Sequence, residues 1–133
     1  MKELVIDADI TKLDEVLAFV DAELEAAGCG MKVQMQLDVA VEELYVNIAH
    51  YAYGEGSGSA TIQMETGDGQ AKITFIDSGM PYNPLEKEDP DITLPAEERP
   101  IGGLGIYMVK KSMDYVTYEH RDGNNVLTIT KKW

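Results

Sequence analysis

The fold is decided by residues 37 to 53, which read LDVAVEELYVNIAHYAY. Apolar residues recur there at the spacing i, i+3, i+4, i+7, i+8 and i+11, which is typical of a helix with one face on a core. The stripe consists of Leu37, Ala40, Val41, Leu44, Tyr45, Ile48 and Ala52. We therefore predict a helix from about Met31 to Tyr53, around which the other elements pack.

Two polar side chains, Glu43 and Asn47, lie beside this stripe. Because they are four residues apart, they stack on one flank of the predicted helix. A carboxylate and a carboxamide at the border between core and solvent suit a Mg²⁺ site, which needs oxygen ligands and room for water. The alternative is an ordinary amphipathic helix with a solvated flank, and the helix alone leaves both interpretations open. His50 shares this flank, where a histidine more often has a structural role.

Length and charge limit the classes of protein to which the chain can belong. Its 133 residues are enough for one domain and too few for two ordinary ones, so residues 1–133 are expected to form a single domain. The formal net charge of −13 disfavours direct binding of nucleic acid, which proteins hold through Lys and Arg. The single cysteine, Cys29, excludes an internal disulfide and fits a cytoplasmic location. Near Met1 we expect neither a signal peptide nor a membrane span.

A short strand and another helix are predicted before the central helix. The alternating residues Lys2 to Ile6 are expected to form an edge strand. Asp9 or Thr11 is expected to cap the helix that follows. The apolar stripe of that helix consists of Leu13, Val16, Leu17, Val20, Leu24 and Ala27, and it ends at Gly28 and Gly30.

Two β-hairpins are predicted in the second half of the chain. Apolar and polar residues alternate from Ala60 to Phe75 on both sides of a turn at residues 67–69. The same pattern recurs in residues 115–130, with Asp122 and Gly123 as the two-residue turn.

A proline-rich loop, about residues 78–101, separates the hairpins and precedes a helix at Gly102 to Ser112. A loop of this length is usually a lid, a binding loop or disordered. The order β-α-α-ββ-loop-α-ββ predicts an α/β two-layer sandwich, with a mixed, mostly antiparallel sheet covered by helices on one face.

Two segments beside this loop contain glycine and suit a nucleotide. Asp77 ends a strand and can accept a hydrogen bond from an exocyclic amine, while Gly79 allows the backbone to approach a planar base. The alternative for this segment is a plain β-turn. Residues 102–105, GGLG, open a helix and can offer backbone N–H groups to phosphate. Their alternative is a hinge with close helix packing.

Three motifs in this order resemble the GHKL superfamily of ATPases, which includes gyrase, the heat-shock chaperone, histidine kinases and mismatch-repair proteins. They are EELYVN at residues 42–47, DSGMP at 77–81 and GGLGIYMV at 102–109. Within the superfamily the chain is most similar to the small anti-sigma-factor serine kinases, because Pro81 stands where other branches have a second glycine. The resemblance implies a Bergerat-type ATP-binding fold, with ATP between helices and sheet and residues 78–101 as the ATP lid.

The resemblance also assigns roles on the central helix. Asn47 would coordinate a Mg²⁺ ion that bridges the phosphates of ATP, and Glu43 would be the general base that takes the proton of the attacking hydroxyl. The family often has a basic residue four positions after the asparagine. Here that position is Tyr51, preceded by His50, so both are candidates for contacts with the phosphates.

Around the lid, the resemblance assigns the remaining contacts with ATP. Asp77 would bind the adenine amine, with Gly79 beside the base. Gly103, Leu104 and Gly105 would meet the phosphates.

The resemblance implies an enzyme, a serine/threonine protein kinase that phosphorylates a small anti-sigma-factor antagonist and also sequesters a sigma factor. The alternative is a non-catalytic module in which ATP switches a binding surface for a regulatory partner. A histidine-kinase catalytic domain is disfavoured, because the sequence contains no upstream dimerisation helix with a phospho-acceptor histidine. A homodimer would form through an unpaired sheet edge or the first helix, and nothing in the sequence decides for it.

Overall fold

The computed structural model describes residues 1–86 and 104–133, and five strands of these residues form one sheet. The strands are β1 (Lys2–Asp7), β2 (Ser59–Gly67), β3 (Gln70–Asp77), β4 (Tyr115–Arg121) and β5 (Asn124–Lys132). Their order across the sheet is β1-β2-β3-β5-β4, so β1 is an edge strand as predicted. Both hairpins, β2–β3 and β4–β5, are confirmed.

Each neighbouring pair of strands in this sheet is antiparallel. The prediction of a mixed sheet is therefore wrong for the described strands. The reason is the number of connecting elements. Two hairpins reverse the chain directly, and the two helices between β1 and β2 return it in the opposite direction.

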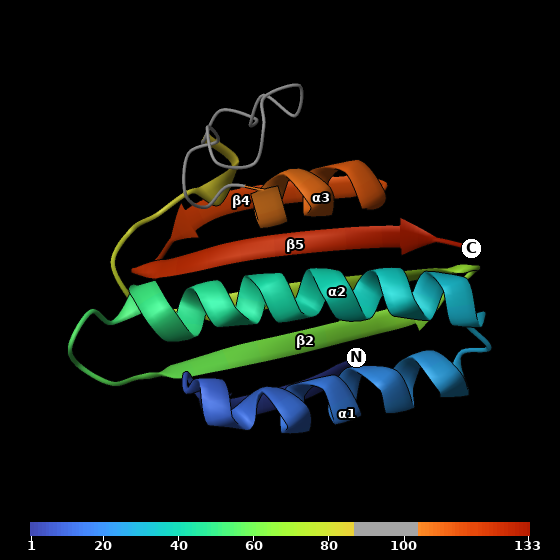
Figure 1. Cartoon of the computed structure of the whole chain (residues 1–133), viewed down its shortest axis with the longest axis horizontal. Helices are drawn as coiled ribbons and strands as arrows, with labels where there is room; N and C mark the ends of the chain where they lie inside the picture. The colour runs from blue at the N-terminus through green and yellow to red at the C-terminus, as the bar shows by residue number, and fades with distance from the viewer. Residues whose placement is uncertain (87–103) are drawn as a thin grey trace.

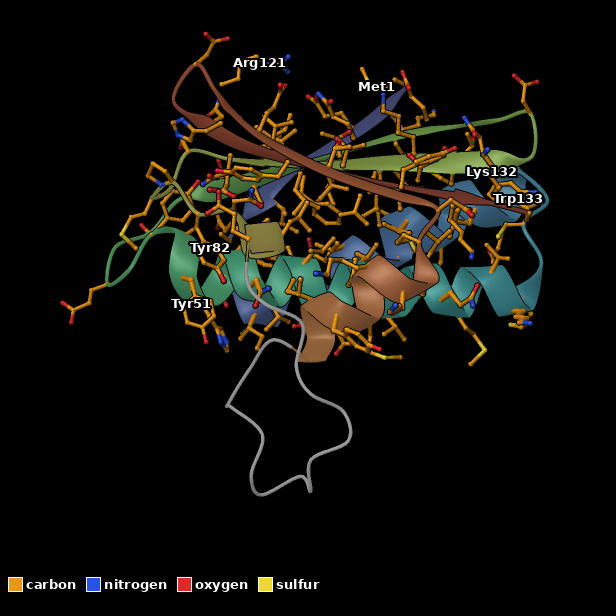
Figure 2. The ribbon with its side chains drawn as sticks, turned by 90° about the horizontal axis from the view of Figure 1, so that it is seen from above. Met1, Tyr51, Tyr82, Arg121, Lys132 and Trp133 are labelled. Carbon is orange, nitrogen blue, oxygen red and sulfur yellow. The ribbon has the colours of Figure 1, made fainter. Side chains whose placement is uncertain are left out.

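The helices of the described residues cover one face of the sheet, and the expected two-layer α/β sandwich is confirmed (Figures 1 and 2). They are α1 (Leu13–Ala26), α2 (Met31–Asn47) and α3 (Leu104–Ser112). Figure 1 shows α2 between α1 and α3, in the central position that its apolar stripe predicts. None of the described helices combines the length and hydropathy that crossing a membrane requires.

Short segments set where the first helices begin and end. Asp9 caps a 3-10 turn, Ile10–Lys12, by accepting a hydrogen bond of 2.9 Å from the Thr11 N–H. At the other end of α1, Gly28 has a φ of +78° and the Cys29 N–H bonds to the Leu24 carbonyl at 3.0 Å. This is the Schellman ending that the Gly28 signal predicts.

The core lies between α1, α2 and the inner face of the sheet. Strand alternation turns Ile62, Ile73 and Ile129 inward, where each is fully buried. The Tyr45 ring is also fully buried, and its hydroxyl donates to the Asp7 carbonyl at 2.7 Å. This bond ties the last turn of α2 to the end of β1.

The helix predicted through Tyr53 changes form near its end. α2 is α-helical to Asn47, and Ile48–Ala52 continues as one π-helical turn. Of the predicted lid, residues 78–86 are described and include a 3-10 turn, Pro84–Glu86. Residues 87–101 of the predicted lid lie outside the described residues, as do Gly102 and Gly103 of the last predicted helix.

Candidate nucleotide-binding site

A cavity of about 650 Å³ lies between the helical layer and the sheet. Its walls come from α2 and its π-helical end, β3, residues 80–84, α3, β4 and β5. Phe75, Ile106 and Leu127 give it an apolar lining, while Glu43 and Asp77 place carboxylates at its surface. A largely apolar cavity of this size with a few polar groups suits a small-molecule ligand.

Glu43 and Asn47 both line this cavity and lie one helical turn apart on α2. The first turn of α3 packs against Glu43. A Cβ at Gly105 would lie 2.0 Å from Glu43 Cδ and 2.1 Å from its Oε1, so only glycine leaves room for this carboxylate. A negative charge near the start of a helix is stabilised by the helix dipole. Gly105 therefore meets Glu43 directly in this structure.

The π-helical turn brings the end of the α2 segment close to the start of the lid. The Ala52 carbonyl accepts a hydrogen bond of 2.8 Å from the Met80 N–H. A Cβ at Gly79 would lie 2.1 Å from the same Ala52 oxygen. Gly79 is thus required by a close approach of two backbones, and it does not itself line the cavity. Single π turns of this kind are frequent at functional sites.

Asp77 ends β3 with its carboxylate in the cavity, and only 7% of the residue is exposed. Its Oδ1 accepts two hydrogen bonds, from the Gly79 N–H at 3.0 Å and from Asn125 Nδ2 at 2.9 Å. No described residue donates a hydrogen bond to Oδ2. The carboxylate therefore has one oxygen engaged by the protein and one acceptor available to a ligand.

Asn125 is a residue of this site that the motifs did not identify. It lies on β5 directly across from Asp77, faces the core and is 6% exposed. A usable signal was present in the sequence: Asn125 is in phase with Leu127 and Ile129, so it is a polar residue at a core-facing position. Recognising its partners required the register between β3 and β5.

The other predicted contacts lie at the rim of the cavity or outside the described structure. His50 and Tyr51 line the cavity with exposed side chains, their ring centroids 6.0 Å apart in an edge-to-face arrangement. Figure 2 shows Tyr51 and Tyr82 at the same end of the molecule, near the C-terminal end of the α2 segment. Leu104 begins α3, and Gly103 lies outside the described residues.

The donor set of the cavity fits a hard cation only in part. Residues 1–86 and 104–133 contain no group of three or more His, Cys, Asp or Glu side chains arranged for a metal ion. Glu43 and Asn47 offer a carboxylate and an amide oxygen to the cavity. A Mg²⁺ ion held there would complete its coordination with oxygens of a ligand and of water, which is common for this ion.

Comparison with known proteins identifies the family. The model described as the histidine kinase-like ATPase domain matches residues 6–131. The chain belongs to this family. The GHKL resemblance is thereby confirmed, and so is the two-layer α/β sandwich inferred from the sequence, apart from the mixed sheet corrected above.

Two curated relatives carry the name serine-protein kinase RsbW. The protein of Bacillus mycoides (strain KBAB4) is 33% identical over 95 residues, which are 68% of this chain and 59% of that relative. The protein of Bacillus cereus (strain B4264) is 34% identical over 95 residues, again 68% of this chain and 59% of the relative. The match thus spans less than two thirds of the relatives' length. Both names belong to the serine-kinase branch.

Two solved structures share the fold. The crystal structure of the RsbU and RsbW domains of Rv1364c from Mycobacterium tuberculosis superposes with a TM-score of 0.63 at 19% identity, over 99% of this chain and 32% of that one. The Acinetobacter baumannii histidine kinase AdeS gives 0.51 at 15% identity, over 99% of this chain and 68% of that one. At these identities the likeness concerns the fold alone.

Proposed function

We propose that this chain is an ATP-binding serine/threonine protein kinase and anti-sigma factor that phosphorylates a serine of a small anti-sigma-factor antagonist. One observation carries the proposal: a single cavity contains the Asp77 carboxylate and the Glu43–Asn47 pair, with the start of α3 packed on Glu43. The similarity to serine-protein kinases supports the choice of acceptor.

The adenine of ATP would lie against Asp77. The free Oδ2 of this carboxylate would accept a hydrogen bond from the 6-amino group, and a buried acceptor of this kind discriminates strongly against a base that lacks the donor. Phe75, Ile48 and Leu127 give the cavity apolar surface for the faces of the base.

The phosphates would lie against α2 and the start of α3. Backbone N–H groups of a helix N-terminus attract anions, which suits an acidic protein because these donors need no basic side chain. When bound, Mg²⁺ supplies positive charge between phosphate oxygens. Asn47 would provide an amide oxygen to that ion, and Glu43 would accept the proton of the serine hydroxyl. Glu43 is therefore the proposed catalytic residue.

The test compares Glu43→Gln with Glu42→Gln, which removes the same charge from the adjacent, exposed position of α2. Each protein is incubated with γ-labelled ATP, Mg²⁺ and candidate antagonist proteins, and phosphoserine is located by mass spectrometry. We expect Glu43→Gln to lower the transfer rate by roughly 10²–10⁴-fold with ATP affinity retained, the usual value of a general base. Glu42→Gln should transfer at the wild-type rate. Transfer that survives Glu43→Gln would remove the role assigned to this residue.

A second candidate function is a non-catalytic module whose partner surface responds to ATP. It is favoured by the contact between the Glu43 carboxylate and Gly105, which holds the carboxylate against α3. It differs from the kinase in one readout, because ATP would change the affinity for an antagonist or a sigma factor without any phosphoserine appearing.

A further inference from the structure

The side-chain amide of Asn125 lies at the centre of a polar cluster that links β5 to β3, β4 and the start of the lid. Its Nδ2 donates to Asp77 Oδ1 at 2.9 Å and to the Met80 carbonyl at 2.9 Å. Its Oδ1 accepts from the Tyr82 N–H at 3.2 Å and from the Tyr118 hydroxyl. Two N–H donors and two lone pairs are the whole capacity of an asparagine amide, and all four are used.

The partners also fix which way the amide points. A backbone carbonyl such as that of Met80 can only accept, and a backbone N–H such as that of Tyr82 can only donate. The opposite orientation would place donor against donor at Tyr82 and acceptor against acceptor at Met80. Nδ2 must therefore face Asp77, and this assignment follows from the backbone.

This fixed amide in turn orients the Asp77 carboxylate. Asn125 Nδ2 and the Gly79 N–H converge on Oδ1, one from the neighbouring strand and one from the turn after β3. Two donors from different directions hold the carboxylate against rotation. Since no described residue donates to Oδ2, the same arrangement keeps that oxygen as an acceptor for whatever enters the cavity.

We propose that Asn125 is the positioning residue that makes the site select 6-aminopurine nucleotides over 6-oxopurine nucleotides, acting through Asp77. This inference rests on the proposed binding of ATP. A 6-amino group donates a hydrogen bond to the fixed Oδ2, whereas a 6-oxo group presents a second acceptor to the same oxygen. Asn125 does not touch the base in this account, and its contribution is the orientation of the carboxylate that does.

The experiment measures the dissociation constants of ADP and IDP, which share sugar and phosphates and differ at position 6 of the base. Wild type is compared with Asn125→Asp and with Asn124→Asp, the same change at the neighbouring position, which faces away from the core. Asn125→Asp removes the Nδ2 donor that holds Asp77 Oδ1 and places a second carboxyl group beside it, so Asp77 is no longer fixed with Oδ2 as an acceptor. The neighbouring charge also favours a protonated Asp77, whose O–H can donate to a 6-oxo group. We expect the wild-type preference for ADP over IDP to fall at least about tenfold, and the remaining preference to become pH-dependent.

The ratio of the dissociation constants of IDP and ADP separates positioning from structural damage, because damage to the cavity weakens the binding of both nucleotides together. Asn124→Asp should keep the wild-type ratio. An unchanged ratio in Asn125→Asp, even with weaker binding of both nucleotides, would overturn the inference and leave the ATP proposal intact. Failure of the wild type to bind either nucleotide would overturn both. If Asn125→Asp does not fold, Asn125→Ser decides: it removes the Nδ2 donor to Asp77 without adding a charge and should lower the ratio, whereas an unaltered ratio counts against the inference.

Discussion

Asp38 of α2 interacts with Asp21 and Glu25 of α1, and this cluster is expected to make the stability of the protein depend on pH. Burial is the main cause that raises the pKa of Asp38, followed by its hydrogen bond with Asp21 and repulsion from Asp21 and Glu25; the result is about 7. Asp38 Oδ1 and Asp21 Oδ1 are buried and have no hydrogen-bond partner among the described residues. Two ionised carboxylates cannot hydrogen-bond to each other, so a proton on Asp38 supplies the missing donor. Burial and the charge of Asp38 also raise the pKa of Cys29.

The direction in which folding shifts the pKa of Asp38 decides whether stability rises or falls with pH. Folding raises the pKa of Asp38 from its ordinary value of 3.8, so the folded protein holds this proton more tightly than the unfolded chain. The stabilisation is complete below about pH 3.8 and is lost as the pH rises through about 7. The full difference corresponds to roughly 4 kcal/mol at 1.36 kcal/mol per tenfold change in proton affinity. Because Asp38 is partly exposed, solvent screening reduces this to roughly 1–2 kcal/mol.

The substitution Asp38→Asn tests this pH dependence, because an asparagine side chain keeps a donor for Asp21 and cannot ionise. At pH 8 it should raise the melting temperature by roughly 3–10 °C over wild type, and near pH 4 the two proteins should melt together. Thermal denaturation followed by circular dichroism between pH 4 and pH 8 measures both values. Asp122→Asn, in the exposed β4–β5 turn, is the control with the same change in charge. A difference in melting temperature that is absent at pH 8, or equal at pH 4 and pH 8, would show that the proton on Asp38 does not stabilise the fold.

Three substitutions test other parts of the structure. Gly79→Ala places a Cβ 2.1 Å from the Ala52 oxygen and should destabilise the fold by about 1–3 kcal/mol in urea unfolding, whereas Gly30→Ala, whose Cβ meets nothing within 4 Å, should cost less. Equal costs for the two would contradict the close approach at Gly79. Gly105→Ala displaces the flexible Glu43 carboxylate, so it should preserve the fold and reduce phosphotransfer; an unchanged transfer rate would show that this contact is unimportant. Tyr45→Phe removes the bond to the Asp7 carbonyl and should lower the free energy of unfolding by about 1–2 kcal/mol. Unaltered urea unfolding would mean that water replaces this hydroxyl.

The elements of this fold were predictable because their signals are local. The stripe from Leu37 to Ala52 reports the face that α2 buries, and the turns at residues 67–69 and 122–123 fix the two hairpins. The Gly28 ending of α1 also depends only on neighbouring residues. Each of these features is decided within a few residues of the chain, where backbone geometry limits the choices.

The interactions of the site were less predictable because they join residues that are distant in sequence. Asn125 contacts Asp77 only through the register of β5 on β3, and Gly105 meets Glu43 only because α3 packs on α2. The π-helical turn after Asn47 could not be predicted from the 3.6-residue periodicity either, because Ile48 and Ala52 still fit the pattern of an α-helix. Of the residues that the motifs singled out, Glu43, Asn47, His50, Tyr51 and Asp77 line the cavity, while Gly79 and Gly105 contact residues that line it instead.

The proposed function requires that the cavity between the Glu43–Asn47 pair and Asp77 binds ATP with Mg²⁺. Its most direct test is the melting temperature as a function of Mg²⁺·ATP concentration, for wild type and for Asn47→Ala. At 100 times the dissociation constant a ligand stabilises by about 2.7 kcal/mol, a shift on the order of 5–10 °C for a domain of this size. We expect a magnesium-dependent rise in wild type that Asn47→Ala abolishes. A folded wild type whose melting temperature does not change with Mg²⁺·ATP would contradict the proposed binding of ATP.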